Sequence, residues 1–212
     1  MGYRKKIYIL FFSLIFSFSN NKIGYIHFIE GECYVKNNQT SNKYFKVYIG
    51  TDIYENDFIK SNDDSHCTIR FNDDKTHVFI EPKTIVSLDD DNFSRSIDLI
   101  NGSIYIKNLF NDKKNVYVFT SNNQISLTNN RLWIKSTKLL YDYIYSLDSN
   151  LDIYNEYHKK NINIDRLSLM YFENQKYSYV SNSVDFIPKY ILNDGYDFNF
   201  NNKKIEIKKY DM

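Results

Sequence analysis

Proline, glycine and an excess of either charge are all scarce in this 212-residue chain, and each shortage excludes a class of protein. The 2 prolines and 6 glycines are too few for a collagen-like chain or a low-complexity linker. Lys and Arg number 27 against 26 Asp and Glu, so there is no basic excess. Nucleic-acid binders and polybasic proteins of the membrane surface carry such an excess, and we expect neither function here.

Recognisable catalytic and cofactor-binding motifs are missing as well. The sequence has no Gly-x-Ser-x-Gly, His-Glu-x-x-His or phosphate-loop motif, so it predicts neither an enzyme nor a cofactor. His66, His77 and Glu81 come closest to a metal site of two histidines and a carboxylate. His66 and Glu81 fall outside the central alternation of their segment. Surface histidines are therefore favoured, and no metal is predicted.

The N-terminus has the pattern of a secretory signal peptide. Arg4–Lys6 are basic, and Ile7–Phe18 are apolar apart from serines. Ser17 and Ser19 then offer small residues for cleavage. The apolar stretch is shorter than the ~20 residues of a membrane-spanning helix. We predict a helical signal peptide at 1–19 and a periplasmic or secreted protein with no transmembrane segment after cleavage; an uncleaved signal anchor is the alternative.

Most of the remaining chain alternates apolar and polar side chains with a period of two, which is typical of half-buried strands. Cys67, Ile69 and Phe71, for example, would share one face of a strand. Clusters of Asn and Asp separate these runs at intervals of about 8–12 residues and favour turns. The pattern predicts an all-β fold, a compact β-sandwich or solenoid-like roll of many short strands. The run 139–145 is compatible with a short helix, although its tyrosines favour a strand.

Glycine, asparagine and aspartate recur at turns in a characteristic order. The segments that carry the order are Gly31–Val35, Val47–Ile53, Asn56–Ser61, Ser65–Thr76, Glu81–Thr84, Leu99–Ile104, Val118–Ser121, Thr128–Ile134, Asp148–Ile153 and Phe172–Gln175. Together they resemble the FecR domain family over about residues 23–180. Asn56, Lys75 and Asn130 stand where that family has glycine. Asparagine is the best non-glycine residue for the left-handed region, so Asn56 and Asn130 preserve the backbone requirement.

The resemblance points to structural turn positions, and it implies no catalytic residues. These positions are Gly31, Gly50, Asp52, Asn56, Asp57, Gly102 and Asn130. The glycines and asparagines among them are expected to need an unusual φ. The two aspartates are expected to accept hydrogen bonds from backbone amides within their turns.

Well-known FecR proteins are inner-membrane regulators of iron-uptake sigma factors, with a cytoplasmic anti-sigma segment and a membrane span. Since this chain has no such cytoplasmic segment, we expect a stand-alone exported FecR domain. Its expected function is non-enzymatic protein interaction or signalling with another protein of the bacterial envelope, through a sheet edge or strand face. The alternative is a cell-wall or polysaccharide-binding module that stacks a glycan on exposed aromatics, Trp133 among them.

Two further features complete the predictions. Cys33 and Cys67 are an even pair in an exported chain, which permits a disulfide; their apolar positions favour two buried thiols instead. Residues 183–212 lie outside the resemblance and alternate on both sides of Asn201–Lys203. They predict a C-terminal β-hairpin extension that caps an open sheet edge.

Overall fold

Seventeen β-strands, and no helix, make up the part of the chain that the structure describes. The computed structural model describes residues 21–37, 43–73, 75–109, 114–128, 130–137, 141–166, 168–173 and 176–181. Within these residues no helix is long and apolar enough to cross a membrane. The all-β prediction is confirmed. The signal peptide predicted at 1–19 and the hairpin predicted at 183–212 lie outside the described residues.

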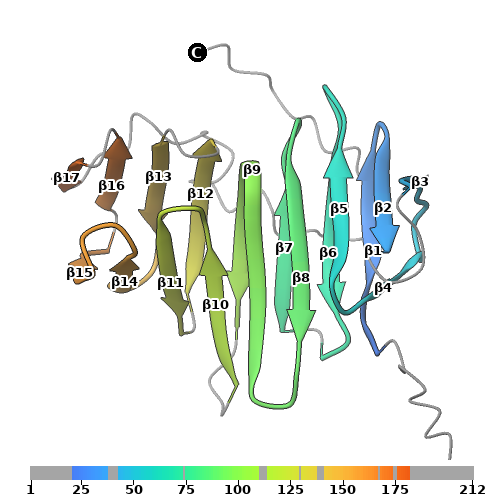
Figure 1. The fold of residues 1–212 in the computed structure, drawn as a ribbon. Helices are drawn as coiled ribbons and strands as arrows, with labels where there is room; N and C mark the ends of the chain where they lie inside the picture. The colour runs from blue at the N-terminus through green and yellow to red at the C-terminus, as the bar shows by residue number, and fades with distance from the viewer. Residues whose placement is uncertain are drawn as a thin grey trace, which may run out of the picture.

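Two β-sheets lie face to face and share the long strand β9 (Figure 1). Sheet A contains, in spatial order, β4 (Asp52–Tyr54), β1 (Lys22–Glu30), β6 (His66–Phe71), β7 (Thr76–Ile80), the second half of β9 (Ser94–Asn108), β12 (Arg131–Thr137), β13 (Tyr141–Ser146), β16 (Ser168–Glu173) and β17 (Lys176–Ser181). Sheet B contains β3 (Phe45–Lys46), β2 (Cys33–Asn37), β5 (Asp57–Ser61), β8 (Ile85–Asp90), the first half of β9, β10 (Asn115–Phe119), β11 (Asn123–Leu127), β14 (Leu151–Asn155) and β15 (Lys160–Ile164).

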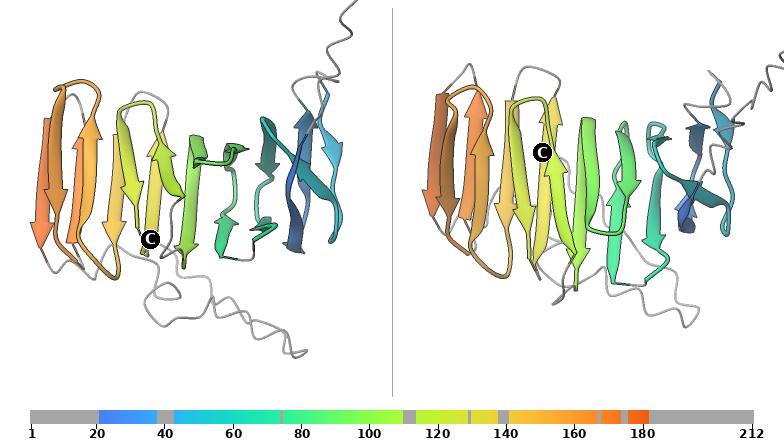
Figure 2. Two further views of the ribbon diagram at one scale, coloured as in Figure 1. Left: turned by 90° about the horizontal axis from the view of Figure 1, so that it is seen from below. Right: turned by 60° about the horizontal axis from the view of Figure 1, so that its bottom comes forward.

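The chain extends both sheets in the same direction, from β3 at one end of the sandwich to β17 at the other (Figures 1 and 2). After β9, hairpins are added to alternate sheets: β10–β11 to sheet B, β12–β13 to sheet A, β14–β15 to sheet B and β16–β17 to sheet A. Neighbouring strands are antiparallel, except that β9 and β10 run parallel. Each hairpin therefore pairs with the hairpin of its own sheet that lies two places away in the sequence, as β11 does with β14 and β13 with β16.

Strand β9 has 15 residues and belongs to both sheets. Arg95–Asn101 pair with β8 in sheet B, whereas Gly102–Asn108 lie in sheet A beside β12. The change of sheet occurs at Gly102, where φ is 101°, a conformation that residues with a Cβ rarely adopt. A Cβ at this position would also collide with Thr84. Glycine is thus required both by the backbone conformation and by the lack of space.

The hydrophobic core lies between the sheets and is built by alternation. In β7, Val78 and Ile80 are buried in the core, whereas Phe79 between them belongs to a separate apolar cluster. Cys67, Ile69 and Phe71 are core residues that share one face of β6, as their spacing predicted. Burying one such aliphatic or aromatic side chain contributes about 1.5–3 kcal/mol, so burial between the sheets supplies most of the stability.

We expect Gly102→Ala to lower the free energy of unfolding by more than the roughly 1–3 kcal/mol that backbone strain alone costs, because the new methyl group also meets Thr84. Gly50→Ala is the matched control, since Gly50 has a φ of 86° but no atom within 4 Å of the place that a Cβ would occupy. Urea denaturation of both variants measures the difference. Equal losses would show that the contact with Thr84 has no cost.

Candidate interaction surface

Four of the predicted turn positions have the left-handed backbone. They are Gly31 (φ 80°), Gly50 (φ 86°), Asn56 (φ 62°) and Gly102 (φ 101°). Three further residues have positive φ that the sequence pattern did not single out: Asp64, Lys83 and Lys159. All three lie in polar turns or loops where a long or charged side chain can point into solvent.

The two predicted turn aspartates have different roles. Asp57 is buried, and its Oδ2 accepts a hydrogen bond from the backbone amide of Tyr54 (2.9 Å) while its Oδ1 accepts one from Asn37 Nδ2 (2.8 Å). Burial raises the pKa of the Asp57 carboxyl above its ordinary value, and the two hydrogen bonds only partly offset that effect. Asp52 pairs with Lys22 Nζ at 2.7 Å through its Oδ1.

Asn130 corrects another expectation. It is not among the positive-φ residues of the described chain, so it does not replace glycine for conformational reasons. Its buried Nδ2 donates to Ser146 Oγ (3.1 Å) and to the carbonyl of Ser149 (3.2 Å), and its Oδ1 accepts from the amide of Asp148 (3.1 Å). The hydrogen bonds of Asn130 therefore connect the turn between β13 and β14 to the start of β12.

Cys33 and Cys67 come together across the core, one from each sheet. Both are fully buried and carry free thiols. A hydrogen bond between the Cys67 thiol and the Cys33 sulfur, which favours the protonated Cys67, raises the pKa of Cys67 well above its ordinary value, and burial adds to the effect. The Cys67 thiol is therefore protonated at neutral pH and lies in contact with the Cys33 side chain.

Trp133 stands on the outer face of sheet A, because its neighbours Leu132 and Ile134 point into the core. It is directly opposite Tyr105 and Tyr145 on the adjoining strands. This line of register partners continues to Phe79 at one end and to Leu169 at the other. We call Phe79, Tyr105, Trp133, Tyr145 and Leu169 the outer row.

Trp133 is only 5% exposed, so the expectation that it offers an exposed stacking surface is wrong. Its indole Nε1 donates to Glu81 Oε1 at 3.1 Å, and Glu81 Oε2 accepts from the Ser103 hydroxyl. Both the ring and its N–H group are thus engaged within the chain. The aromatic side chain that a sugar-binding function required is not available at this position.

The histidines and Glu81 do not form the metal site considered from the sequence. His66 Nε2 lies 3.1 Å from Glu30 Oε2, whereas Glu81 is held by Trp133 and Ser103. Across the described residues, no three His, Cys, Asp or Glu side chains are grouped as metal ligands.

Exposed apolar side chains gather at one edge of sheet B. Tyr44, Phe45, Tyr48 and Ile49 lie within six residues of one another, and Tyr48 and Ile49 are 67% and 66% exposed. We call these four residues the edge patch. Phe45 belongs to β3, which among the described strands pairs only with β2. The patch thus combines apolar side chains with a strand edge that no other described strand pairs, two features that favour binding of a partner chain.

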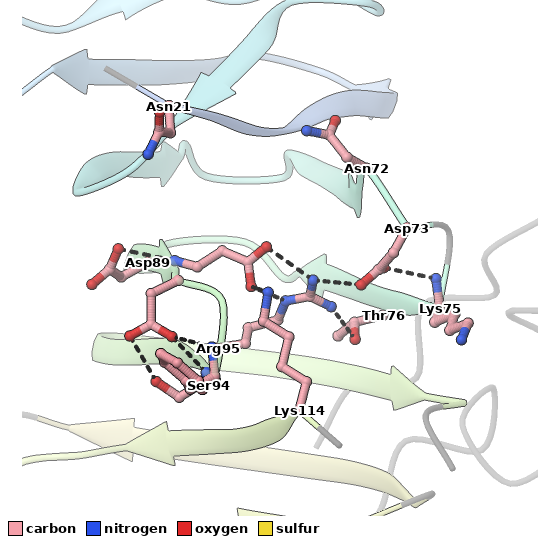
Figure 3. A network of polar contacts seen from close by, with 12 residues as sticks. Asn21, Asn72, Asp73, Lys75, Thr76, Asp89, Ser94, Arg95 and Lys114 are labelled. Carbon is pink, nitrogen blue, oxygen red and sulfur yellow. Dashed lines mark hydrogen bonds and ion pairs between the residues drawn. The ribbon is translucent and has the colours of Figure 1, made fainter. Parts of the chain in front are cut away.

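A buried ion cluster joins the two sheets at one end of the core (Figure 3). Arg95 of β9 is 1% exposed. Its Nε and Nη2 donate to both carboxylate oxygens of Asp90 (3.0 and 3.1 Å), and Nη2 also donates to Asp73 Oδ2 (2.8 Å). Its guanidinium lies over the ring of Phe71, 3.7 Å from the centroid. Asp73 lies in the β6–β7 turn of sheet A and Asp90 in sheet B, so one side chain ties the sheets together.

The electrostatics of this cluster depend on Arg95. Partial burial, the largest single influence, raises the pKa of the Asp73 carboxyl. The hydrogen bonds from Arg95 and from the backbone amide of Lys75, together with the nearby positive charges of Arg95 and Lys114, outweigh it and leave the pKa below its ordinary value. Lys114 Nζ adds a second cation 2.6 Å from Asp90 Oδ1. Sequence reasoning missed this cluster, because Arg95 occupies a core-facing position that alternation assigns to an apolar residue.

Comparison with known proteins supplies a structural likeness and no family assignment. Two crystal structures, at 1.65 and 2.50 Å resolution, of a protein from Parabacteroides distasonis described as a "putative anti-sigma factor" superpose on this chain with a TM-score of 0.53 and 11% sequence identity. What they share is the fold. The match covers 58% of this chain and 59% of the other, so each protein has a large part without counterpart. No known family profile and no curated protein sequence matches the chain.

Arg95→Met should lower the free energy of unfolding by about 3–5 kcal/mol at neutral pH, because it leaves two carboxylates without their buried cation. Lys114→Met, which removes a partly exposed partner of Asp90, should cost about 1 kcal/mol or less. Urea titrations of both variants test this.

The stabilisation from the Arg95 cluster should also depend on pH. The folded-state pKa of Asp73 is lowered, so its contribution is complete above the unfolded pKa of about 3.9 and is lost as pH falls through the lower folded pKa. The difference between wild type and Arg95→Met should therefore shrink on acidification. A constant difference would contradict this account.

Refolding in a glutathione redox buffer should link Cys33 to Cys67, since the two thiols already touch. Oxidised glutathione accepts the two electrons and the two protons, and a mixed disulfide is displaced by the second thiol. The bond closes a loop of about 35 residues. By reducing the entropy of the unfolded chain, it should raise the free energy of unfolding by about 4 kcal/mol. Non-reducing peptide mapping identifies the bond, with Cys67→Ser as control; a wild-type map with free thiols only would contradict the expectation.

Proposed function

We propose that this chain is an exported, non-enzymatic FecR-like module of a bacterial envelope, which acts in protein interaction or signalling by binding another envelope protein at the edge patch. The colinear turn series and the fold in common with an anti-sigma factor support a regulatory module. The pattern of an N-terminal export signal supports the location.

The single observation that carries the proposal is the edge patch. A folded β-protein normally protects its edge strands with charge, proline or a covering segment, whereas the loop that follows the edge strand β3 leaves Tyr48 and Ile49 about two-thirds exposed. Val47 between Lys46 and Tyr48 is buried, which anchors the segment against the core and fixes the exposed side chains. Exposing these apolar side chains to water brings no stability. Their arrangement suits a partner that adds an extended apolar segment beside β3.

The chemistry of the partner follows from the patch. Lys36 Nζ lies 5.9 Å from the Tyr44 ring centroid and 4.9 Å from that of Phe58, and Lys46 is paired with Glu32 at 2.7 Å. The patch is thus aromatic, with its nearby charges held in local contacts. We expect a protein segment with aliphatic or aromatic residues at alternate positions, because these reach the patch while the backbone pairs with β3.

Affinity capture from the native envelope fraction tests the proposal. The double variant Tyr48→Ser/Ile49→Ser should reduce capture of the partner by at least about tenfold, which corresponds to roughly 1.4 kcal/mol of binding free energy. Phe93→Ser is the matched control, because Phe93 is 78% exposed but lies away from the patch, in the β8–β9 turn. Equal capture of the partner by wild type and the double variant would contradict the proposal. A loss of capture in Phe93→Ser as large as that in the double variant would contradict it as well.

A further inference from the structure

The outer face of sheet B carries two aromatic rings that solvent can reach. In β10 the core residues Val116 and Val118 alternate with Tyr117 and Phe119, which therefore point outward. Both rings are partly exposed, in contrast to the buried outer row of sheet A. They lie next to one another on the same strand, where a ligand can contact both.

Polar side chains border the two rings on both neighbouring strands. Each ring has one register partner on β9 and one on β11, and all four partners are polar. They are Ser96 and Ser126 for Tyr117, and Asp98 and Gln124 for Phe119. Among the described residues, no hydrogen bond or ion pair engages these four side chains. Their hydroxyl, amide and carboxylate groups are therefore free to bind a ligand beside the rings.

The same face is acidic. Asp89 and Asp152 are the next register partners of Ser96 and Ser126, so three aspartates, Asp98 included, surround the rings. The two rows of register partners from β8 to β14 contain no Lys, Arg or His. Partial burial raises the pKa of Asp98 above its ordinary value, and the negative charge of Asp89 raises it further. A cationic ligand would relieve the repulsion between these carboxylates.

The backbone of this face is already paired. In sheet B, β9 lies between β8 and β10, β10 between β9 and β11, and β11 between β10 and β14. The amide and carbonyl groups of these strands therefore bond to their neighbours. An extended peptide binds by adding to an edge strand, and no such edge exists here. Recognition at this face must rest on side chains, through stacking on the rings and hydrogen bonds from the polar groups.

The geometry of the rings favours a sugar chain over a flat ligand. The ring centroids of Tyr117 and Phe119 are 6.2 Å apart, and the ring planes are inclined by 43°, so one flat molecule cannot stack on both. Successive pyranose rings of a polysaccharide are turned about their glycosidic bonds and can meet two inclined surfaces. Their C–H groups carry partial positive charge, which the negative face of an aromatic ring attracts.

The charge of the face selects among sugars. Three aspartates repel polysaccharides that carry uronic acids or phosphates, and they attract protonated amino groups. Asp98 is exposed and lies directly opposite Phe119. An amino group on a sugar stacked over Phe119 would therefore meet the Asp98 carboxylate, while the sugar hydroxyls meet Gln124 on the other side.

We propose that Tyr117 and Phe119, with Asp98 and Gln124 beside them, form a binding site for a cationic amino-sugar polysaccharide. The two rings stack on successive sugar units, and the aspartates bind the protonated amino groups. This site is independent of the proposed function, because the edge patch lies beside β3 at the end of sheet B, whereas β10 lies in the interior of that sheet.

Isothermal titration calorimetry of the full chain with a glucosamine hexasaccharide tests the proposal at mildly acidic pH, where the amino groups are protonated. The double variant Tyr117→Ser/Phe119→Ser should weaken binding at least about tenfold, which corresponds to roughly 1.4 kcal/mol. The edge-patch variant Tyr48→Ser/Ile49→Ser is the matched control and should bind the sugar as wild type does. Loss of sugar binding in the control alone would overturn the proposal.

A second variant removes the charge and keeps the rings. Wild type should bind the N-acetylated hexasaccharide severalfold more weakly than the glucosamine form, and Asp98→Asn should reduce that preference. Raising the salt to about 1 M, where the Debye length is about 3 Å, should reduce it as well. These results do not require the ring variant to fold.

Three outcomes would contradict the site. The first is no binding of the glucosamine hexasaccharide by wild type at millimolar concentration. The second is an unchanged preference for the glucosamine form in Asp98→Asn. The third is equally tight binding of a lysine hexapeptide, which would assign the face to basic peptides.

Discussion

The structure depends on one strand that takes part in both sheets. Because β9 pairs with β8 and β10 in sheet B and with β7 and β12 in sheet A, the spacing between the layers and the register of each are fixed relative to one another. Core residues from the two halves of β9, such as Ile97 and Ile104, then face a common interior. Gly102 permits the crossing, and Arg95 closes the end of the interior that β9 enters.

The fold class and the strands could be predicted from the sequence because alternation reports burial on one face. Cys67, Ile69 and Phe71 illustrate this, as does Gly50 at its turn. Alternation does not tell which sheet a strand joins, so the double membership of β9 was not predictable. It also assigns Arg95 to an interior that ordinarily excludes charge. Asp73, in the β6–β7 turn, and Asp90, at the end of β8, compensate that burial.

The candidate surfaces were harder to predict, for physical reasons. Trp133 falls at an outward position, where a single sheet would expose it, yet it is buried and its indole N–H donates to Glu81. Ile49 looks like a core residue next to Gly50, yet it lies in a turn and is exposed, whereas Val47 is buried. Asn130 shows the same limit: its side-chain hydrogen bonds, and not its backbone angle, explain its position.

The parallel pairing of β9 and β10 has a consequence for how the sandwich comes apart. Beyond that pair, each hairpin pairs with the previous hairpin of its own sheet. The β10–β17 region therefore resembles a linear array whose stability is a sum of terms from neighbouring units. Such arrays fray from their free end and tolerate gain or loss of whole units there. We therefore expect hydrogen-exchange protection to rise stepwise from β17 back towards β9, and an insertion of one more hairpin pair to lengthen the protein without disturbing its first half.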